Sequence, residues 1–170
     1  MGLDMYLTKK TYVGNEYRKP EQMITVTMPE NQDGVVFSIK QPIKNERISE
    51  ISERVGYWRK ANQIHKWFVD NVQGGNDDCG EYEVSEEKLT QLLSDCKAVK
   101  DNKDLAKAKL PTQSGFFFGG TEYDEYYMND IDNTIKIIED LLAEKGDEKY
   151  LSGEVYYRSS WQHHLNNTLK

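Results

Sequence analysis

Cysteine and histidine are scarce in this chain, and their scarcity excludes whole classes of site. Two cysteines, Cys79 and Cys96, are too few for a disulfide framework or a thiolate metal centre. The three histidines are His65, His163 and His164, and they show none of the spacings typical of zinc ligands. We therefore expect neither a metal site nor a cofactor.

The chain also lacks long apolar runs and an excess of positive charge. No apolar stretch approaches the length of a bilayer span, and residues 1–7 have no basic and apolar leader. The net charge is −7, with 22 Lys and Arg against 29 Asp and Glu. General binding to nucleic acid or to an anionic membrane needs a basic footprint, so we expect neither. The expected location is a reducing cytoplasm.

Complete catalytic signatures are missing as well. The glycine-rich segment 115–121 has no lysine after Gly120 and three phenylalanines inside it, so it cannot be a phosphate-binding P-loop. Residues 76–80 have a calcium-like composition without the alternating ligands of an EF-hand loop. No Gly-x-Ser-x-Gly elbow occurs. Binding is therefore favoured over catalysis.

What the chain does contain predicts one α+β domain over residues 1–170, with 162–170 as a frayed tail. Strands are expected at 3–7 and 155–161, and a hairpin at 23–28 and 35–39. Apolar residues at helical spacing predict three main helices, over 48–72, 85–99 and 121–142. They should pack on a small, mostly antiparallel sheet that joins the first strand to the last. Gly56 either allows a close approach or breaks the first helix.

The segment 57–68 is the richest in potential ligand contacts. Arg59, Asn62 and Lys66 fall on one face of the expected helix, where they could hold a phosphate or a carboxylate. The alternative is a solvated face, or ion pairs with the acidic residues of 121–150. His65 is either a hydrogen-bonded structural histidine or a general base, although the sequence shows no carboxylate to orient it.

Residues 111–120 form a second candidate segment. Gln113 and Ser114 offer short polar side chains, and Gly115 would let backbone amides approach a ligand. A buried strand followed by a turn is the alternative for this phenylalanine-rich stretch. Ser159, Ser160 and Trp161 could close a pocket formed by the two segments.

Several motifs together resemble one family of small uncharacterised proteins encoded by bacteria and their phages. They are Met-Gly-Leu-Asp-Met-Tyr-Leu at 1–7, Tyr-Trp-Arg-Lys-Ala-Asn at 57–62, Ile-His-Lys-Trp-Phe-Val at 64–69, Asp-Asp-Cys-Gly-Glu-Tyr at 77–82, Pro-Thr-Gln-Ser-Gly-Phe-Phe-Phe-Gly at 111–119, Tyr-Asp-Glu-Tyr-Tyr at 123–127 and Tyr-Arg-Ser-Ser-Trp at 157–161. The resemblance brings no activity. It implies the cytoplasm of a bacterial host cell, where phage proteins of this size often act by occupancy.

These observations lead to one main hypothesis and two alternatives. The main hypothesis is a protein that sequesters a small, nucleotide-derived anion without chemistry, as an anti-defence sponge would. The first alternative is a protein–protein inhibitor that uses the acidic helix within 121–150, with a host protein or a second copy as its partner. The second alternative is a hydrolase or lyase that depends on His65.

Overall fold

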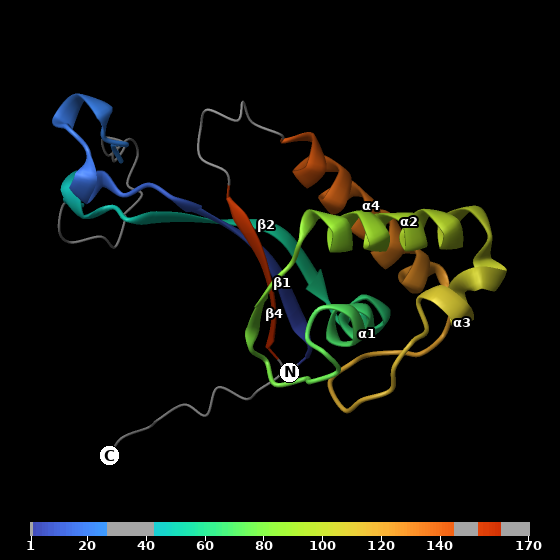
Figure 1. The fold of residues 1–170 in the computed structure, drawn as a ribbon. Coiled ribbons are helices and arrows are strands. Elements are labelled where there is room, and N and C mark those ends of the chain that lie inside the picture. Colours follow the sequence, from blue (N-terminus) through green and yellow to red (C-terminus); the bar gives the residue numbers. More distant parts are fainter. Residues whose placement is uncertain (1, 27–42, 145–152, 161–170) are drawn as a thin grey trace, which may run out of the picture.

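The chain forms an antiparallel sheet with helices on one of its faces, which confirms the α+β prediction (Figure 1). The computed structural model describes residues 2–26, 43–144 and 153–160. The strands are β1 (Asp4–Tyr12), β2 (Glu50–Arg59), β3 (Glu81–Glu83) and β4 (Glu154–Ser160). The helices are α1 (Asn62–Asn71), α2 (Glu86–Asp101), the short α3 (Ala106–Lys109) and α4 (Glu125–Ala143). Among these residues, no helix is both long and apolar enough to cross a membrane.

The sheet has the strand order β2-β1-β4-β3. The first and last strands pair directly, as the sequence predicts, with Met5 opposite Ser159 and Leu7 opposite Tyr157. Alternation along β1 gives the sheet two unlike faces. Leu3, Met5 and Leu7 are fully buried against the helices, whereas the side chains between them lie on the other face.

The predicted helix over 48–72 is wrong in its first half. Residues 50–59 are strand β2, because they pair with the whole of β1. Lys60 then takes a left-handed conformation (φ 63°), and α1 begins two residues later. Apolar residues at three- and four-residue steps fitted a helix, but the long-range pairing with β1 decides the structure.

Gly56 serves close approach, the first of the two predicted alternatives. A Cβ at this position would lie 2.9 Å from the Ile137 side chain and 3.1 Å from the Leu7 side chain. The register of β1 and β2 shifts beside it, between Leu7 and Thr8. The glycine thus lets α4 pack directly on the sheet.

The two long helices begin at side-chain caps. The Ser85 hydroxyl accepts a hydrogen bond from the Lys88 amide. At α4 the cap is Asp124, which accepts from the Tyr127 amide, so the helix begins at Glu125 and not at 121. Helix α4 ends at Ala143, one residue beyond the predicted end at 142.

The buried side chains form one core between the sheet and the helices. Leu92 and Val99 of α2 meet Ile131 and Ile138 of α4 in it. At its centre the Trp58 indole nitrogen donates to the Thr134 hydroxyl over 2.8 Å. This bond joins β2 to α4 and satisfies a buried polar group.

Beyond the body, β1 and β2 continue as a two-stranded arm, which projects at the upper left of Figure 1. Asn15 holds its tip together: the side-chain amide donates to the carbonyls of Ile24 and Asn45, both over 2.7 Å. Residues 23–26 form no strand, and the rest of the predicted hairpin lies almost wholly outside the described residues.

Candidate functional site

The strand-to-helix junction separates three residues that the sequence placed on one helical face. Arg59 ends β2, where its guanidinium lies 3.3 Å from the Asp4 carboxylate. Lys66 lies on the exposed side of α1 and pairs with Asp70, four residues on, over 2.7 Å. Asn62 is buried at the start of α1. These three side chains therefore do not form one wall.

Asn62 fixes the second candidate segment against the helix. Its amide nitrogen donates to the Phe118 carbonyl (3.0 Å) and the Gly120 carbonyl (2.8 Å), and its amide oxygen accepts from the Gln113 amide (2.8 Å). The loop 111–120 thus packs on α1, as a pocket formed by these two segments would require. However, the bonds that hold it use the functional groups of the Asn62 side chain, so Asn62 has a structural role.

The loop 111–120 forms no strand, and its residues 114–116 are exposed to solvent. Ser114 and Gly115 are exposed, and a Cβ on Gly115 would lie 2.7 Å from the Phe118 ring. Phe118 is buried, whereas Phe116 is 94% exposed at the turn. The predicted buried strand is therefore absent from this stretch, which the structure describes throughout.

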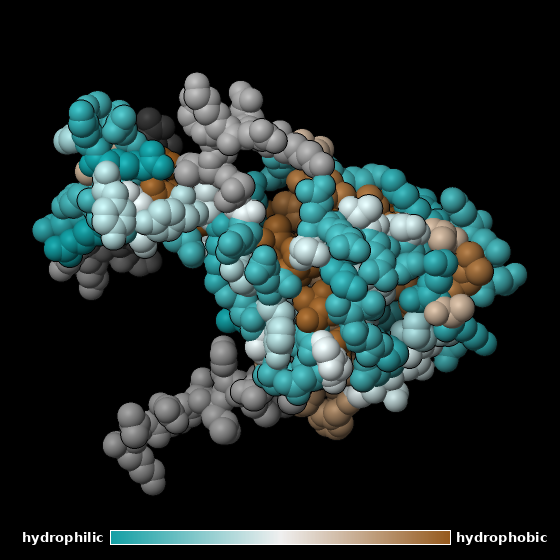
Figure 2. Space-filling view, viewed as in Figure 1, coloured by the Kyte–Doolittle hydropathy of each residue, from teal (hydrophilic) through white to brown (hydrophobic). Residues whose placement is uncertain are grey.

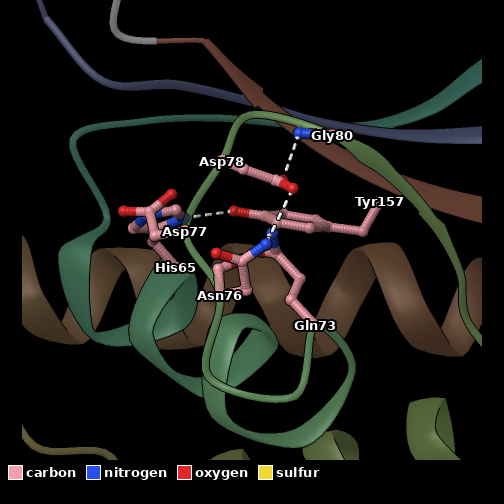
Figure 3. Close-up of polar contacts among 7 residues, drawn as sticks. All are labelled: His65, Gln73, Asn76, Asp77, Asp78, Gly80 and Tyr157. Atoms are coloured by element: carbon pink, nitrogen blue, oxygen red, sulfur yellow. Dashed lines mark hydrogen bonds and ion pairs between the residues drawn. The ribbon is translucent and has the colours of Figure 1, made fainter.

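His65 lies in a hydrogen-bonded chain with two partners from distant segments (Figure 3). Its Nδ1 is 2.7 Å from the Tyr157 hydroxyl of β4, and its Nε2 is 3.0 Å from a carboxylate oxygen of Asp77. A carboxylate only accepts, so Nε2 carries the proton and Nδ1 accepts from Tyr157. Asp77 is the orienting carboxylate that the sequence did not reveal.

Two of the three side chains in this chain have no access to solvent, whereas the Asp77 side chain is 25% exposed. His65 and Tyr157 are fully buried. Burial, with the negative charge of Asp77 and the proximity of Cys79, raises the pKa of Tyr157 well above its ordinary value. The phenol stays protonated and continues to donate to His65. The arrangement fixes loop 73–80 on the core and matches the structural alternative for His65.

The third predicted part of the pocket, residues 159–161, does not form one wall either. Ser159 is buried beside Met5, and among the described residues its hydroxyl has no hydrogen-bond partner. Ser160 ends β4 opposite Asp4, while Trp161 lies outside the described residues. Among the described members of the predicted set, Asn62, His65 and Ser159 are buried, so these members present no common surface.

A different surface carries free cationic groups: the sheet face opposite the helices, called the open face here. Its residues alternate with the core residues of each strand. Tyr6 lies opposite Tyr57 on one side and Arg158 on the other, and Thr8 lies opposite Arg54. In Figure 1 the helices all lie on the other side of the sheet.

Two guanidinium groups flank one ring on the open face. The Arg54 Cζ lies 4.9 Å from the centre of the Tyr6 ring, and the Arg158 Cζ lies 5.8 Å from it. The Tyr57 ring is 5.5 Å away, centre to centre. Within the described part of the chain, neither arginine has a carboxylate at ion-pair distance.

Two other cations on the open face already have carboxylate partners, and Glu83 and Glu154 add negative charge to the same face. Lys10 pairs with Glu81, and Arg59 pairs with Asp4. A hydrogen bond to Asp4 raises the pKa of Tyr57, and one to Glu154 raises the pKa of Tyr156 to about 12. Both phenols are therefore neutral donors at neutral pH. Arg54 and Arg158 remain available to an added anion.

The molecular surface is hollowed on this side. Figure 2 shows a concavity between the β1–β2 arm and the body, bordered by hydrophilic residues. The sequence contained a signal for the open face, since Tyr6 and Thr8 alternate with Met5 and Leu7 along one strand. The neighbouring strand of the open face, β2, was predicted as a helix. Its pairing with β1 places Arg54 and Tyr57 beside Tyr6.

Comparisons with protein-family models, with curated proteins and with solved structures find no match to this chain. In residues 2–26, 43–144 and 153–160, no group of three or more His, Cys, Asp and Glu could hold a metal ion.

Proposed function

We propose that the protein binds a small, nucleotide-derived anion on the open face and sequesters it unchanged. The observation that carries the proposal is the pair of guanidinium groups, Arg54 and Arg158, on either side of the Tyr6 ring without described carboxylate partners. In a chain of net charge −7, two such cations beside one ring favour an external anion.

The residue types fit a ligand that combines phosphate with a planar ring. A guanidinium binds phosphate oxygens through two parallel hydrogen bonds, and its plane also accepts a stacked base. The Tyr57 ring, 40% exposed, offers a second stacking surface beside it. Tyr57 donates its hydroxyl proton to Asp4, so its ring rather than its hydroxyl is left for the ligand.

The surrounding acids favour a small ligand over a long strand. Asp4, Glu81 and Glu154 border the two arginines. They limit the positive surface to the width of a few strands. A long nucleic acid needs many phosphate contacts, each of which releases a counterion, and this surface is too small to supply them. His65 and Tyr157 are fully buried, so we propose no reaction for the bound molecule.

The proposal is tested by native mass spectrometry of protein taken directly from cells, followed by calorimetry with the nucleotides that it releases. Wild type should carry an added mass that leaves intact on denaturation. Arg54→Gln with Arg158→Gln should weaken binding by about tenfold or more, because charged hydrogen bonds are lost.

Lys44→Gln with Arg47→Gln is the matched control. Both residues are exposed and lie on the arm, and their substitution removes two charges, as in the test variant. If the control weakened binding equally, the effect would come from the overall charge of the protein and not from Arg54 and Arg158. A released product that differs from the molecule supplied would contradict sequestration, and absence of any nucleotide binding would overturn the proposal.

A second function, protein binding through α4, is favoured by one observation. Tyr126 is 81% exposed at the start of this acidic helix, and Phe116 is exposed on the preceding loop. Exposed aromatic side chains beside acids suit a partner with a basic, partly apolar surface. Charge reversal of Glu122, Glu125 and Asp140 should then abolish partner binding, whereas Arg54→Gln should leave it unchanged.

A further inference from the structure

A pocket lies at the opposite end of the molecule from the arm, where α3 meets the start of α4 (Figure 1). Its volume is about 330 Å³, within the range of small-molecule sites. Lys103, Asp104 and Lys107 contribute charged groups to its lining, and Tyr123, Tyr127 and Met128 contribute apolar surface.

The two lysines differ from their neighbours in lacking counter-charges. Lys97, Lys100 and Lys109 pair with Glu139, Asp132 and Asp95 respectively, at 2.6–2.7 Å. Among the described residues, neither Lys103 nor Lys107 has a carboxylate at ion-pair distance. Both unpaired ammonium groups line the same pocket. Asp104 offsets one of them, which leaves a single net positive charge.

The two tyrosine hydroxyls of the lining are bound within the fold, but the Tyr123 hydroxyl keeps its proton free to donate. The Tyr127 hydroxyl donates to the Leu110 carbonyl over 2.9 Å, and the Tyr123 hydroxyl accepts from the Thr112 amide. Burial raises the pKa of Tyr127, so this phenol adds no negative charge. The Tyr123 ring already lies 6.0 Å from the Lys107 ammonium group. Ring faces, a thioether, ammonium groups and the hydroxyl donor of Tyr123 remain for a ligand.

We propose that this pocket is a second binding site, which takes a small organic monocarboxylate that carries a ring. The ring packs on Tyr123 and Met128, and the carboxylate meets Lys103 and Lys107. The pocket contains no guanidinium fork of the kind that Arg54 and Arg158 offer to phosphate on the open face. A net charge of one suits a monoanion better than a nucleotide.

The experiment uses 2-naphthoate and its neutral analogue 2-naphthamide, with the protein labelled at its methionine methyl groups. The Met128 methyl resonance, assigned with Met128→Leu, should shift and saturate with 2-naphthoate. The neutral amide should bind roughly fivefold more weakly, or worse, because it forfeits two partly exposed ion pairs.

Lys103→Gln with Lys107→Gln should weaken naphthoate binding by about the same factor and remove the preference over the amide. The matched control is Lys19→Gln with Lys136→Gln, which also removes two charges from exposed lysines, both outside the pocket lining. Equal shifts by acid and amide in wild type would overturn the proposal. So would an unmoved Met128 methyl at millimolar naphthoate, or equal weakening by the control.

Discussion

The Tyr157 hydroxyl lies 2.7 Å from Nδ1 of His65, and neither side chain exposes any surface. This contact joins β4 to α1, and Asp77 extends it to the loop after α1. The Tyr157 ring also stacks on Phe68, with 3.9 Å between ring centres. A polar chain of this kind in a core is strongly stabilising only while every member has its partner.

Tyr157→Phe should therefore destabilise the protein by about 1–3 kcal/mol, because it leaves Nδ1 of buried His65 without a donor. The free energy of unfolding in urea measures the loss. Tyr156→Phe is the neighbouring control. Its hydroxyl bonds to exposed Glu154, so its loss should cost less than about 0.5 kcal/mol. Equal losses in the two variants would contradict the special role of the His65 contact.

Asn62→Asp should release the loop after α3. A carboxylate has the shape of the amide but cannot donate to the Phe118 and Gly120 carbonyls, and it places a negative charge beside both. We expect a loss of about 2–4 kcal/mol in stability and faster amide exchange of residues 113–120. Asn129→Asp, at an exposed position of α4, supplies the control for the added charge. Unchanged exchange in the loop would show that Asn62 does not hold it.

Gly56→Ala tests the close contact of α4 with the sheet. The new methyl group would lie 2.9 Å from Ile137 and 3.1 Å from Leu7, so helix or strand must shift. The expected cost is about 1–3 kcal/mol, measured by urea unfolding. Gly120→Ala is the control because its Cβ would meet nothing within 4 Å. If Gly56 were inside a helix, alanine would instead stabilise the protein.

The sequence predicted those elements whose signals are local. Ser85 caps α2 through its own side chain, and the isoleucines of α4 repeat at helical spacing. Alternation along residues 3–7 and 155–161 predicted the first and last strands. In each case one short stretch of chain contained enough information to predict its structure.

Apart from the pairing of the first and last strands, features that depend on contacts between distant residues escaped prediction. Residues 50–59 had helical spacing, and only pairing with β1 makes them a strand. Asp77 reaches His65 across a loop, and Arg158 reaches Tyr6 from the far end of the chain. No local pattern announces such contacts, so the sequence identified candidate residue types but not the surface on which they meet.

Asp130 gives the protein a pH-dependent stability. Burial raises the pKa of its carboxyl group to about 6, partly offset by a hydrogen bond from Gln63 and reinforced by Asp124. In the unfolded chain the pKa is about 3.9, so between these values the folded state binds a proton that the unfolded state lacks. Through this group, stability is therefore greatest below about pH 4 and falls as the pH rises to about 6.

Asp130→Asn isolates this effect, since the amide is neutral at every pH and of the same shape. Near pH 4 the variant and the wild type should be equally stable. At pH 7.5 the variant should be more stable by about 1–2 kcal/mol, after discounting for the partial exposure of the group. Urea unfolding at both pH values measures the difference. A gain that is the same at pH 4 and pH 7.5 would mean that the substitution acts through packing, and a loss at pH 7.5 would mean that the ionised carboxylate is the stabilising form.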